Sequence, residues 1–542
     1  MKLKIAAFII LLAFQNIFPQ SLLRTFEIGN NKKTTTFESE NPASNSINDI
    51  LVVGDTIWLG TSRGLSQSTD NGTSWKNYYN TSEFGTESVT ALLYAGGVIF
   101  ASTAHSVEKD GTSFPEGSGL RFSSDNGITW QAVSQPLDEP GDSSVRYGNN
   151  VLRALPVTVA VQNIIYDFAF AGNKIWIAAF AGGLRSVSFD SLTNNTKAKW
   201  SRTILPPDYL SSLKPSDSLS FTLQPVAGKF GKEEYLNYRL FSLVAINDST
   251  LYAGTANGIN KTTNAFLPAD SLRWEKFNHQ NQDNPISGNF VVALGFNTYY
   301  KTVFAASWKA NDQNEFYAVS YSKDGGVNWN TTLLGEKPHN FASYSSSTII
   351  TTDNGPFLNE IRSSLNSWLN TGSIIDKKTG LALQTSVFYS AAFSNNGLTA
   401  WVGSEDGLVK NEMPYSNWSD DWKIFYASQP LQRKDDSYAF PNPFSPKMEK
   451  VKIKYNTGGA SKKVTIRIFD FGMNYLRTVI QNVDRGNPAH VINASNADGI
   501  NGVLDYWDGK DDSGSVVPNG VYFYRVEIEG QELQFGKIMV IQ

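Results

Sequence analysis

The sequence contains 542 residues and no cysteine. Disulfide bonds, thiolate metal sites and a lipid anchor on cysteine are therefore excluded, so core burial and strand pairing must hold the chain together. Histidine is also scarce, and the four histidines at positions 105, 279, 339 and 490 lack the paired spacing of a metal site. Neither a glycine-rich phosphate loop nor a nucleophile elbow is present. The sequence accordingly predicts no metal and no cofactor.

Charge and long apolar runs are lacking as well. The formal net charge is −4 without a long basic run, which removes the electrostatic footprint that nucleic-acid binding requires. The one apolar run at the N-terminus, from Ile5 to about Phe14, follows Lys2 and Lys4 and is too short to span a bilayer. This order is typical of a secretory signal peptide, so residues 1–20 are predicted to direct export. No transmembrane segment is predicted elsewhere, and we expect an exported protein.

Aromatic residues are abundant by contrast. The chain has 33 Phe, 23 Tyr and 13 Trp, and turns rich in Gly and Asn separate its short apolar runs. This combination favours an all-β protein.

One octet pattern, Ser-x-Asp-x-Gly-x-x-Trp, occurs three times at uneven intervals. It reads STDNGTSW at 68–75, SSDNGITW at 123–130 and SKDGGVNW at 322–329. One interpretation is catalytic, with an Asp placed beside a Ser. The other is architectural, with each copy marking the same turn of a repeated unit.

The sequence around the first octet favours the architectural interpretation. Residues 47–79 contain four short β-type runs separated by turn signals such as Gly54-Asp55 and Asp70-Asn71-Gly72. The second run and its turn, TIWLGTSRGL at 56–65, recur as KIWIAAFAGGL, TLYAGTANGI and TAWVGSEDGL. About seven such units begin near residues 47, 88, 163, 239, 289, 339 and 386. A repeated four-stranded unit predicts a β-propeller over residues 21–426, with about seven blades.

Each octet then falls at the turn between the third and fourth strands of a blade. There an Asp accepts hydrogen bonds from turn amides, a Gly allows positive φ and a Trp packs between sheets. The octets resemble the Asp-box, or BNR-like, motif of sialidases and related propellers, in which the motif is structural. The resemblance implies structural roles for Ser68, Asp70, Gly72, Trp75, Ser123, Asp125, Gly127, Trp130, Ser322, Asp324, Gly326 and Trp329.

A second domain follows the repeats. Residues 427–437 form a polar linker, and residues 438–542 read as short alternating strands, which favours an immunoglobulin-like sandwich. The ordered motifs FPNPF, TIRIFD, WDGKDDSG, PNGVYFYRV and GKIMVIQ resemble the C-terminal sorting domain of type IX secretion cargo and the immunoglobulin-like domain of flagellar hook-capping proteins. The resemblance implies recognition by the type IX secretion machinery and a location at the outer-membrane surface or outside the cell. The alternative is an accessory domain without a sorting role.

The turn from Asp508 to Gly514 carries three carboxylates, which suggests a calcium loop. Its spacing differs from that of the twelve-residue calcium loop, so we interpret it as a hairpin turn.

Asp-box propellers include glycoside hydrolases, so catalysis needs separate consideration. The arginine and Tyr–Glu signature of sialidases is absent, but paired carboxylates roughly 5–9.5 Å apart cannot be read from a sequence. Acidic residues on inserted loops include Asp138, Glu139, Glu233 and Glu234. A sensor-type propeller is disfavoured because no transmembrane, kinase or DNA-binding segment follows. The leading hypothesis has no catalytic residue: an exported propeller that binds a protein or glycan, or serves as an envelope component. The alternative is a secreted glycoside hydrolase.

Long insertions indicate where a ligand would bind. The loops 131–162 and 201–238 follow the second and third units and mix cationic with aromatic groups suited to a glycan or protein. The predicted binding residues are Arg146, Tyr147, Arg153, Lys229, Phe230 and Lys232. The alternative is that these loops only cover the flank of the propeller.

Overall fold

The computed structural model describes residues 37–39, 41–109, 112–223, 233–310, 312–360, 365, 367–377, 381–383, 385–427, 437–440, 442–447, 450–457, 461–485 and 503–542. The predicted signal peptide and most of the predicted linker lie outside these residues. The described part is almost entirely β-structure.

The first sheet shows the unit that the rest of the chain repeats. Strands β2 (Ile47–Val53), β3 (Thr56–Thr61), β4 (Gly64–Ser68) and β5 (Trp75–Asn77) form an antiparallel meander. A short strand, β1 (Phe37–Ser39), pairs with the outer side of β5. The hairpins Gly54-Asp55 and Ser62-Arg63 separate the strands, as the turn signals predict.

Six further sheets follow with the same meander order. The described residues give their strands as β6 (Ser88–Ala95), β7 (Val98–Lys109), β8 (Thr112–Ser123), β9 (Gln131–Val133); β12 (Ile165–Ala171), β13 (Lys174–Ala179), β14 (Gly183–Ser188), β15 (Ser201–Arg202); β17 (Leu240–Ala245), β18 (Leu251–Thr255), β19 (Gly258–Thr262), β20 (Trp274–Phe277), with β16 (Ser212–Leu213) outside β20; β21 (Phe290–Asn297), β22 (Thr302–Trp308), β23 (Ala318–Ser322), β24 (Asn330–Thr332); β25 (Pro338–Tyr344), β26 (Ser347–Thr352), β27 (Gly355–Glu360), β28 (Leu369–Asn370); and β31 (Phe388–Phe393), β32 (Thr399–Ser404), β33 (Leu408–Glu412), β34 (Trp422–Phe425).

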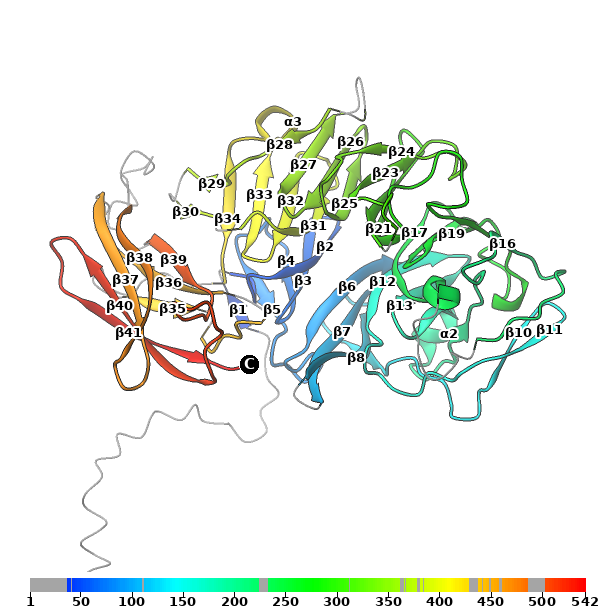
Figure 1. Cartoon of the computed structure of the whole chain (residues 1–542), viewed down its shortest axis with the longest axis horizontal. Helices are drawn as coiled ribbons and strands as arrows, with labels where there is room; N and C mark the ends of the chain where they lie inside the picture. The colour runs from blue at the N-terminus through cyan, green and yellow to red at the C-terminus, as the bar shows by residue number, and fades with distance from the viewer. Residues whose placement is uncertain are drawn as a thin grey trace, which may run out of the picture. The chain divides into compact units, whose positions relative to one another are not determined.

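Short elements occupy the connections between these strands. They are the hairpins β10 (Ser144–Tyr147) with β11 (Asn150–Arg153) and β29 (Ile375–Asp376) with β30 (Leu381–Ala382), the helices α2 (Phe189–Asn194) and α3 (Pro414–Asn417), and the 3-10 turns η3 (Glu233–Tyr238) and η4 (Ala269–Ser271). The sheets are labelled in succession in Figure 1.

The first strands of the seven sheets form a closed ring. β2 contacts β6, and the contacts continue through β12, β17, β21 and β25 to β31, which contacts β2 again. The protein is therefore an all-β propeller, and we number its blades 1 to 7 from β2 to β31.

Every first strand carries a β-bulge near its start. In each of the seven strands the register shifts across the second or third residue. A bulge inserts one residue and redirects its side chain. The bulged residues are Asn48, Thr90, Tyr166, Phe241, Val292, His339 and Tyr389. They lie on the face where the first strands begin, which we call the mouth face. The opposite face, which carries the octet turns, is the turn face.

Large buried side chains fill the space between neighbouring sheets. The third residue of several second strands is a fully buried aromatic, namely Trp58, Phe100, Trp176, Phe304 or Trp401. Trp58 packs with Val89 of the next blade, and Trp401 packs with Ile47 and Trp75 across the closure of the ring. Because the core is divided among these interfaces, each blade depends on both neighbours.

The three octets form the same turn. In the second copy, Ser123 Oγ donates to Asp125 Oδ1 at 2.7 Å and accepts from Gly127 N at 2.8 Å. Asp125 also accepts from the backbone N and hydroxyl of Thr129, at 2.9 and 2.6 Å. Asp70 and Asp324 make the corresponding bonds with the residues four positions after them.

The glycine of each octet fits against an aromatic side chain of the preceding blade. Gly72, Gly127 and Gly326 have φ of +84°, +81° and +105°. A Cβ on them would lie 2.8 Å from Trp401, 2.4 Å from the Tyr78 hydroxyl and 2.6 Å from Phe277, respectively. Glycine is required here by both its conformation and this close approach.

The described C-terminal residues form two sheets around one core. One sheet contains β35 (Tyr438–Phe440), β36 (Val451–Tyr455) and β39 (Val503–Trp507), and the other contains β38 (Tyr475–Arg485), β37 (Lys462–Phe469), β40 (Gly520–Ile528) and β41 (Gln534–Val540). The buried core includes Ile453, Ile466, Trp507 and Tyr524. In the acidic turn, which joins β39 to β40 of the other sheet, Asp511 Oδ1 accepts from Ser513 Oγ and Ser515 N at 2.6 and 2.9 Å, and Lys510 forms an isolated antiparallel bridge with Val516.

Ion pairs connect β36 with the turn between β32 and β33. Lys452 pairs with Asp406, and both side chains are almost completely buried. Lys450 lies 3.6 Å from Glu405, and Arg63 Nη2 donates to Pro443 O at 2.9 Å. Since breaking a buried ion pair leaves an uncompensated charge, these contacts favour a docked sandwich over a freely tethered one.

We predict that Asp125→Ala lowers the free energy of unfolding by about 1 kcal/mol, the typical cost of losing a side chain that caps backbone amides. Burial opposes ionisation slightly, but hydrogen bonds from Thr129 and Ser123 lower the pKa of Asp125 to about 2. This stabilisation is therefore complete above the pKa of about 4 of the unfolded chain and is lost as pH falls toward 2. Urea unfolding at pH 7 and pH 2.5 measures it.

The matched control is Ile128→Ala, because Ile128 is 77% exposed in the same turn. Equal stability of the Asp125 variant and wild type at pH 7 would contradict the structural role.

Candidate functional site

The structure describes three of the six predicted binding residues, all on the hairpin of β10 and β11. Arg146 and Arg153 are exposed on β10 and β11. Tyr147 is fully buried, and its hydroxyl donates to Leu272 O at 2.6 Å, so its side chain is not available to a ligand. The prediction was wrong for this residue because the 131–162 loop packs Tyr147 into the core between blades 3 and 4. Lys229, Phe230 and Lys232 lie outside the described residues.

One of the acidic loop residues is committed to an ion pair. Asp138 Oδ1 lies 2.7 Å from Arg185 Nη1, and Oδ2 accepts from Val157 N at 2.7 Å. Burial opposes ionisation, but the hydrogen bond and the charge of Arg185 lower the pKa of Asp138. Asp138 therefore stabilises its loop and is unsuited to acid–base catalysis. Glu139 is exposed, and Glu233 and Glu234 lie in η3.

A row of aromatic rings follows the mouth face from blade 3 to blade 7. Tyr166 contacts Phe241 at 5.9 Å between ring centroids, and Phe241 contacts Phe180 and Phe290 at 5.8 and 6.3 Å. Phe290 pairs across the sheet with Trp308, which contacts His339 at 5.5 Å. His339 contacts Tyr389 at 5.4 Å. We call these seven residues the aromatic arc: Tyr166, Phe180, Phe241, Phe290, Trp308, His339 and Tyr389.

None of the seven rings is completely buried, and Tyr166 is 40% exposed. Four of the seven, Tyr166, Phe241, His339 and Tyr389, are bulge residues. The bulges therefore explain why rings from separate blades reach the same face. A partly exposed aromatic surface on a rigid scaffold is typical of a site for a glycan or a peptide.

Polar groups accompany the blade 5 to blade 7 end of the arc. His339 Nε2 lies 2.6 Å from Asp353 Oδ1, and the Lys337 ammonium lies 4.2 Å from the Trp308 ring centre. Burial lowers the pKa of His339, although Asp353 acts in the opposite direction. Burial also raises the pKa of Tyr389, with smaller contributions from Glu405 and Asp353. At neutral pH both groups are uncharged, which suits stacking and hydrogen bonding more than charge recognition.

The mouth face also gathers a Ser–His–Glu cluster that the sequence did not reveal. His105 Nδ1 lies 2.9 Å from Ser118 Oγ and 3.2 Å from Glu87 Oε2, while Nε2 lies 3.7 Å from Glu116. However, Ser118 donates to Glu87 at 2.6 Å. The amides of Gly117 and Gly119 already donate to Ala160 O and Gln135 Oε1, so neither can stabilise an oxyanion. The cluster is a hydrogen-bonded part of the β7–β8 hairpin and lacks the geometry of a nucleophilic triad.

Two carboxylates on first strands link adjacent blades. Asp49 Oδ2 accepts from Leu92 N of blade 2, and Asp167 Oδ2 accepts from Leu243 N of blade 4, both at 2.7 Å. Burial raises the pKa of Asp49 to about 7 and that of Asp167 to about 8, against the effect of these hydrogen bonds. In blade 6 the equivalent residue is Asn340, whose Oδ1 accepts from its neighbour Phe341 N at 2.6 Å. Each acid therefore bridges two blades, and the charge of Asp49 contributes to the raised pKa of Asp167.

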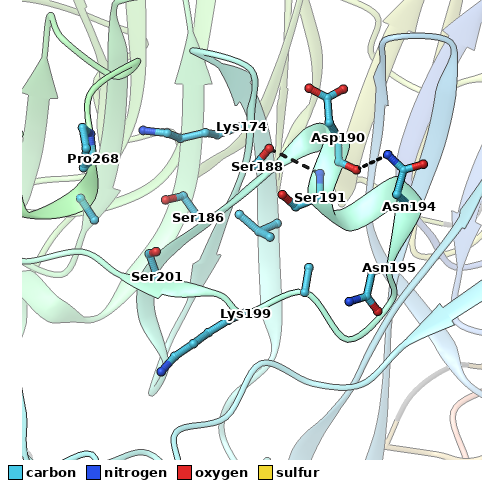
Figure 2. Close-up of a pocket in the computed structure, with 13 residues that line it drawn as sticks. Lys174, Ser186, Ser188, Asp190, Ser191, Asn194, Asn195, Lys199, Ser201 and Pro268 are labelled. Carbon is cyan, nitrogen blue, oxygen red and sulfur yellow. Dashed lines mark hydrogen bonds between the residues drawn. The ribbon is translucent and has the colours of Figure 1, made fainter.

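A large open pocket lies on the turn face between blades 3 and 4, with a volume of about 720 Å³. Helix α2 occupies the connection in blade 3 where other blades carry the octet turn, and Figure 2 shows its polar residues along one side of the pocket. Lys174 Nζ donates to Ala265 O and Leu267 O, so its charge is used to join the blades. The remaining lining consists mainly of hydroxyl and amide groups, together with the exposed Lys199. These residues do not bring together the side chains of a catalytic site.

Across the described ranges, no cluster of three or more His, Asp or Glu side chains is placed to hold a metal ion. Among those same residues, no helix is both long and apolar enough to span a membrane.

No protein family is matched by this sequence, and no curated protein matches it. Similar solved structures include an ancestral GH74 enzyme (14% identity, TM-score 0.47, 93% of this chain and 63% of that chain). Others are YCF48 bound to D1 peptide (12% identity, TM-score 0.39, 71% and 98%) and PorZ, an essential bacterial surface component of the type-IX secretion system of Porphyromonas gingivalis (12% identity, TM-score 0.23, 92% and 75%). They are similar to this chain in fold.

We predict that Asp49 and Asp167 make the stability of the protein depend on pH. The pKa of Asp167 is raised from 3.8 to about 8 in the folded protein. Below about pH 4 the carboxyl is protonated in both the folded and the unfolded chain, so it does not destabilise the folded state there. As pH rises from about 4 to 8, wild type loses stability relative to Asp167→Asn by up to about 1.4 kcal/mol per pH unit. Urea unfolding from pH 4 to 9 measures the difference.

The reciprocal variant, Asn340→Asp, should introduce a pH dependence of the same sign in blade 6. A constant difference between Asp167→Asn and wild type across this range would contradict the prediction.

Proposed function

We propose that this protein is a non-catalytic, exported β-propeller that binds a glycan or protein partner in the cell envelope through the aromatic arc. The observation that carries this proposal is the row of partly exposed rings supplied by five consecutive blades. Stacking on such rings provides affinity with little loss of conformational freedom, because aromatic side chains have few rotatable bonds.

The described carboxylates near the mouth face do not favour a hydrolase. A glycosidase needs an acid and a second carboxylate facing one glycosidic bond. Asp138 is paired with Arg185, Asp49 and Asp167 bridge backbone amides, and Asp353 is paired with His339. Each of these acids has a structural partner, which supports binding over hydrolysis. A secreted glycoside hydrolase remains the alternative function.

We also propose that the C-terminal sandwich directs export through the type IX secretion machinery and leaves the protein at the outer-membrane surface or outside the cell. The ordered motifs from FPNPF to GKIMVIQ and the two-sheet architecture support this role.

Substitution of arc residues tests the binding proposal. Biolayer interferometry on a glycan panel and on envelope extracts compares wild type with Tyr166→Ala and with a Trp308→Ala/Tyr389→Ala double variant. Loss of a central aromatic contact costs about 2 kcal/mol, so affinity should fall roughly 30-fold. Tyr299→Ala is the control, since Tyr299 is 65% exposed on the turn between β21 and β22.

Thermal unfolding of each variant verifies that it is folded. Unchanged affinity in the folded arc variants would overturn the proposal. Release of reducing ends from a bound polysaccharide would favour the hydrolase.

Export is tested with a reporter. Residues 427–542 are fused to a fluorescent protein that carries a signal peptide, and the fusion is expressed in a bacterium with type IX secretion. We expect fluorescence at the surface or in the medium, and periplasmic retention of the reporter without these residues. Periplasmic retention of both would exclude the sorting role.

A further inference from the structure

Two arginines share one carboxylate beneath the mouth face of blade 3. Arg185 lies 2.7 Å and Arg202 lies 3.5 Å from opposite oxygens of Asp138. The side chains of Arg185 and Asp138 are only 2% and 7% exposed, and that of Arg202 is 19% exposed. Two guanidinium groups and one carboxylate leave a surplus of one positive charge in a largely buried place. Such a charge is costly unless an anion accompanies it.

Among the described residues, the neighbouring charged groups offset this surplus only in part. Burial is the main cause that lowers the pKa of Arg202, and the charge of Arg185 lowers it further, while Asp138, Tyr238 and Asp142 act in the opposite direction. Asp142 accepts a bond from Glu139 N at 3.2 Å, and its charge raises the pKa of Arg202 less than that of Asp138 does. Among the described residues, Asp138 is the carboxylate that lies against both arginines.

Polar atoms without partners gather at the same place. Among the described residues, Arg185 Nη2 and Thr203 Oγ1 are buried and make no hydrogen bond, and Arg202 Nη1 makes no hydrogen bond beyond its 3.5 Å ion pair with Asp138. Thr203 is only 3% exposed, so its hydroxyl is not satisfied by bulk water. Buried polar groups are normally paired, and each unpaired group indicates an unseen partner. Asn163, whose side chain also lacks partners, lies beside Gly182.

Arg202 and Thr203 border a small pocket. It has a volume of about 40 Å³ and is lined by Arg202 and Thr203, the glycines Gly182 and Gly183, and apolar side chains that include Leu155 and Ile204. A cavity needs roughly 10–15 Å³ for each water, so this one holds a few waters or one small anionic group. It adjoins the aromatic arc, because Ala181 of the pocket follows Phe180 of the arc directly in sequence.

We propose that this pocket binds a carboxylate group, held by the Arg202 guanidinium and the Thr203 hydroxyl, with Arg185 supplying charge behind them. A carboxylate offers acceptor oxygens to several donors at once and neutralises the surplus charge. The proposal does not depend on the proposed function of the aromatic arc. If both hold, the partner carries an acidic group at the blade 3 end of the arc.

The probe is sodium acetate, titrated into the full-length chain by calorimetry at constant ionic strength maintained with sodium chloride. Wild type should show one saturable site. Thr203→Val keeps the shape but removes the hydroxyl, and Arg202→Gln removes the charge. Each should weaken acetate binding about tenfold or more, the effect of losing a hydrogen bond to a charged group. Arg146→Gln is the control, because Arg146 is exposed on β10 and outside the pocket.

Two observations would overturn the proposal. The first is that wild type shows no saturable binding of acetate at concentrations of roughly 10 mM and above. The second is that wild type and Thr203→Val bind acetate with equal affinity. The Thr203 variant keeps the test decisive if Arg202→Gln does not fold. Glucuronate and an acetylated dipeptide with a free C-terminus are then compared, so that a sugar acid and a chain terminus are distinguished as the source of the carboxylate.

Discussion

Closure of the ring of first strands is the constraint on which the other features depend. β31 meets β2 although more than 300 residues separate them in sequence, and the contact includes a bond from Ser390 Oγ to Ile47 O at 3.3 Å. Asn395 Nδ2 also donates to Gly54 O at 3.0 Å, and the rings of Trp401 and Trp75 meet nearby. Without cysteine, this closure relies on packing and hydrogen bonds alone. It also places seven equivalent bulges on one face, which is what gathers the aromatic arc.

The two faces of the propeller differ in chemistry because the strand connections differ. Tight octet turns on the turn face use their Asp side chains to bind their own amides and their glycines to approach the preceding blade. Bulges and longer insertions lie on the mouth face, where the side chains contribute less to holding the blades together. Binding residues on such connections vary without disturbing the ring, and so a ligand site belongs on the mouth face.

The architecture could be predicted from the sequence, whereas the candidate site could not. The predicted units begin within two residues of the observed first strands, because each first strand is apolar and is followed by a short turn and a second apolar strand. The arc depends on bulges, which change side-chain direction without a fixed sequence signature. Aligning the units on their first residues would have placed Tyr166, Phe241, His339 and Tyr389 in equivalent positions. Tyr147 was assigned to a ligand because a loop with cationic and aromatic residues can equally pack against the flank of a blade.

Hydrogen exchange with and without the bound partner tests the central claim most directly, namely that ligands bind at the mouth face. The account predicts slower exchange at the starts of the first strands of blades 3 to 7, around residues 164–168, 239–243, 288–292, 337–341 and 387–391. Exchange in the three octet turns should not change. Protection of the octet turns or of the pocket beside α2, with no change along the arc, would contradict the account.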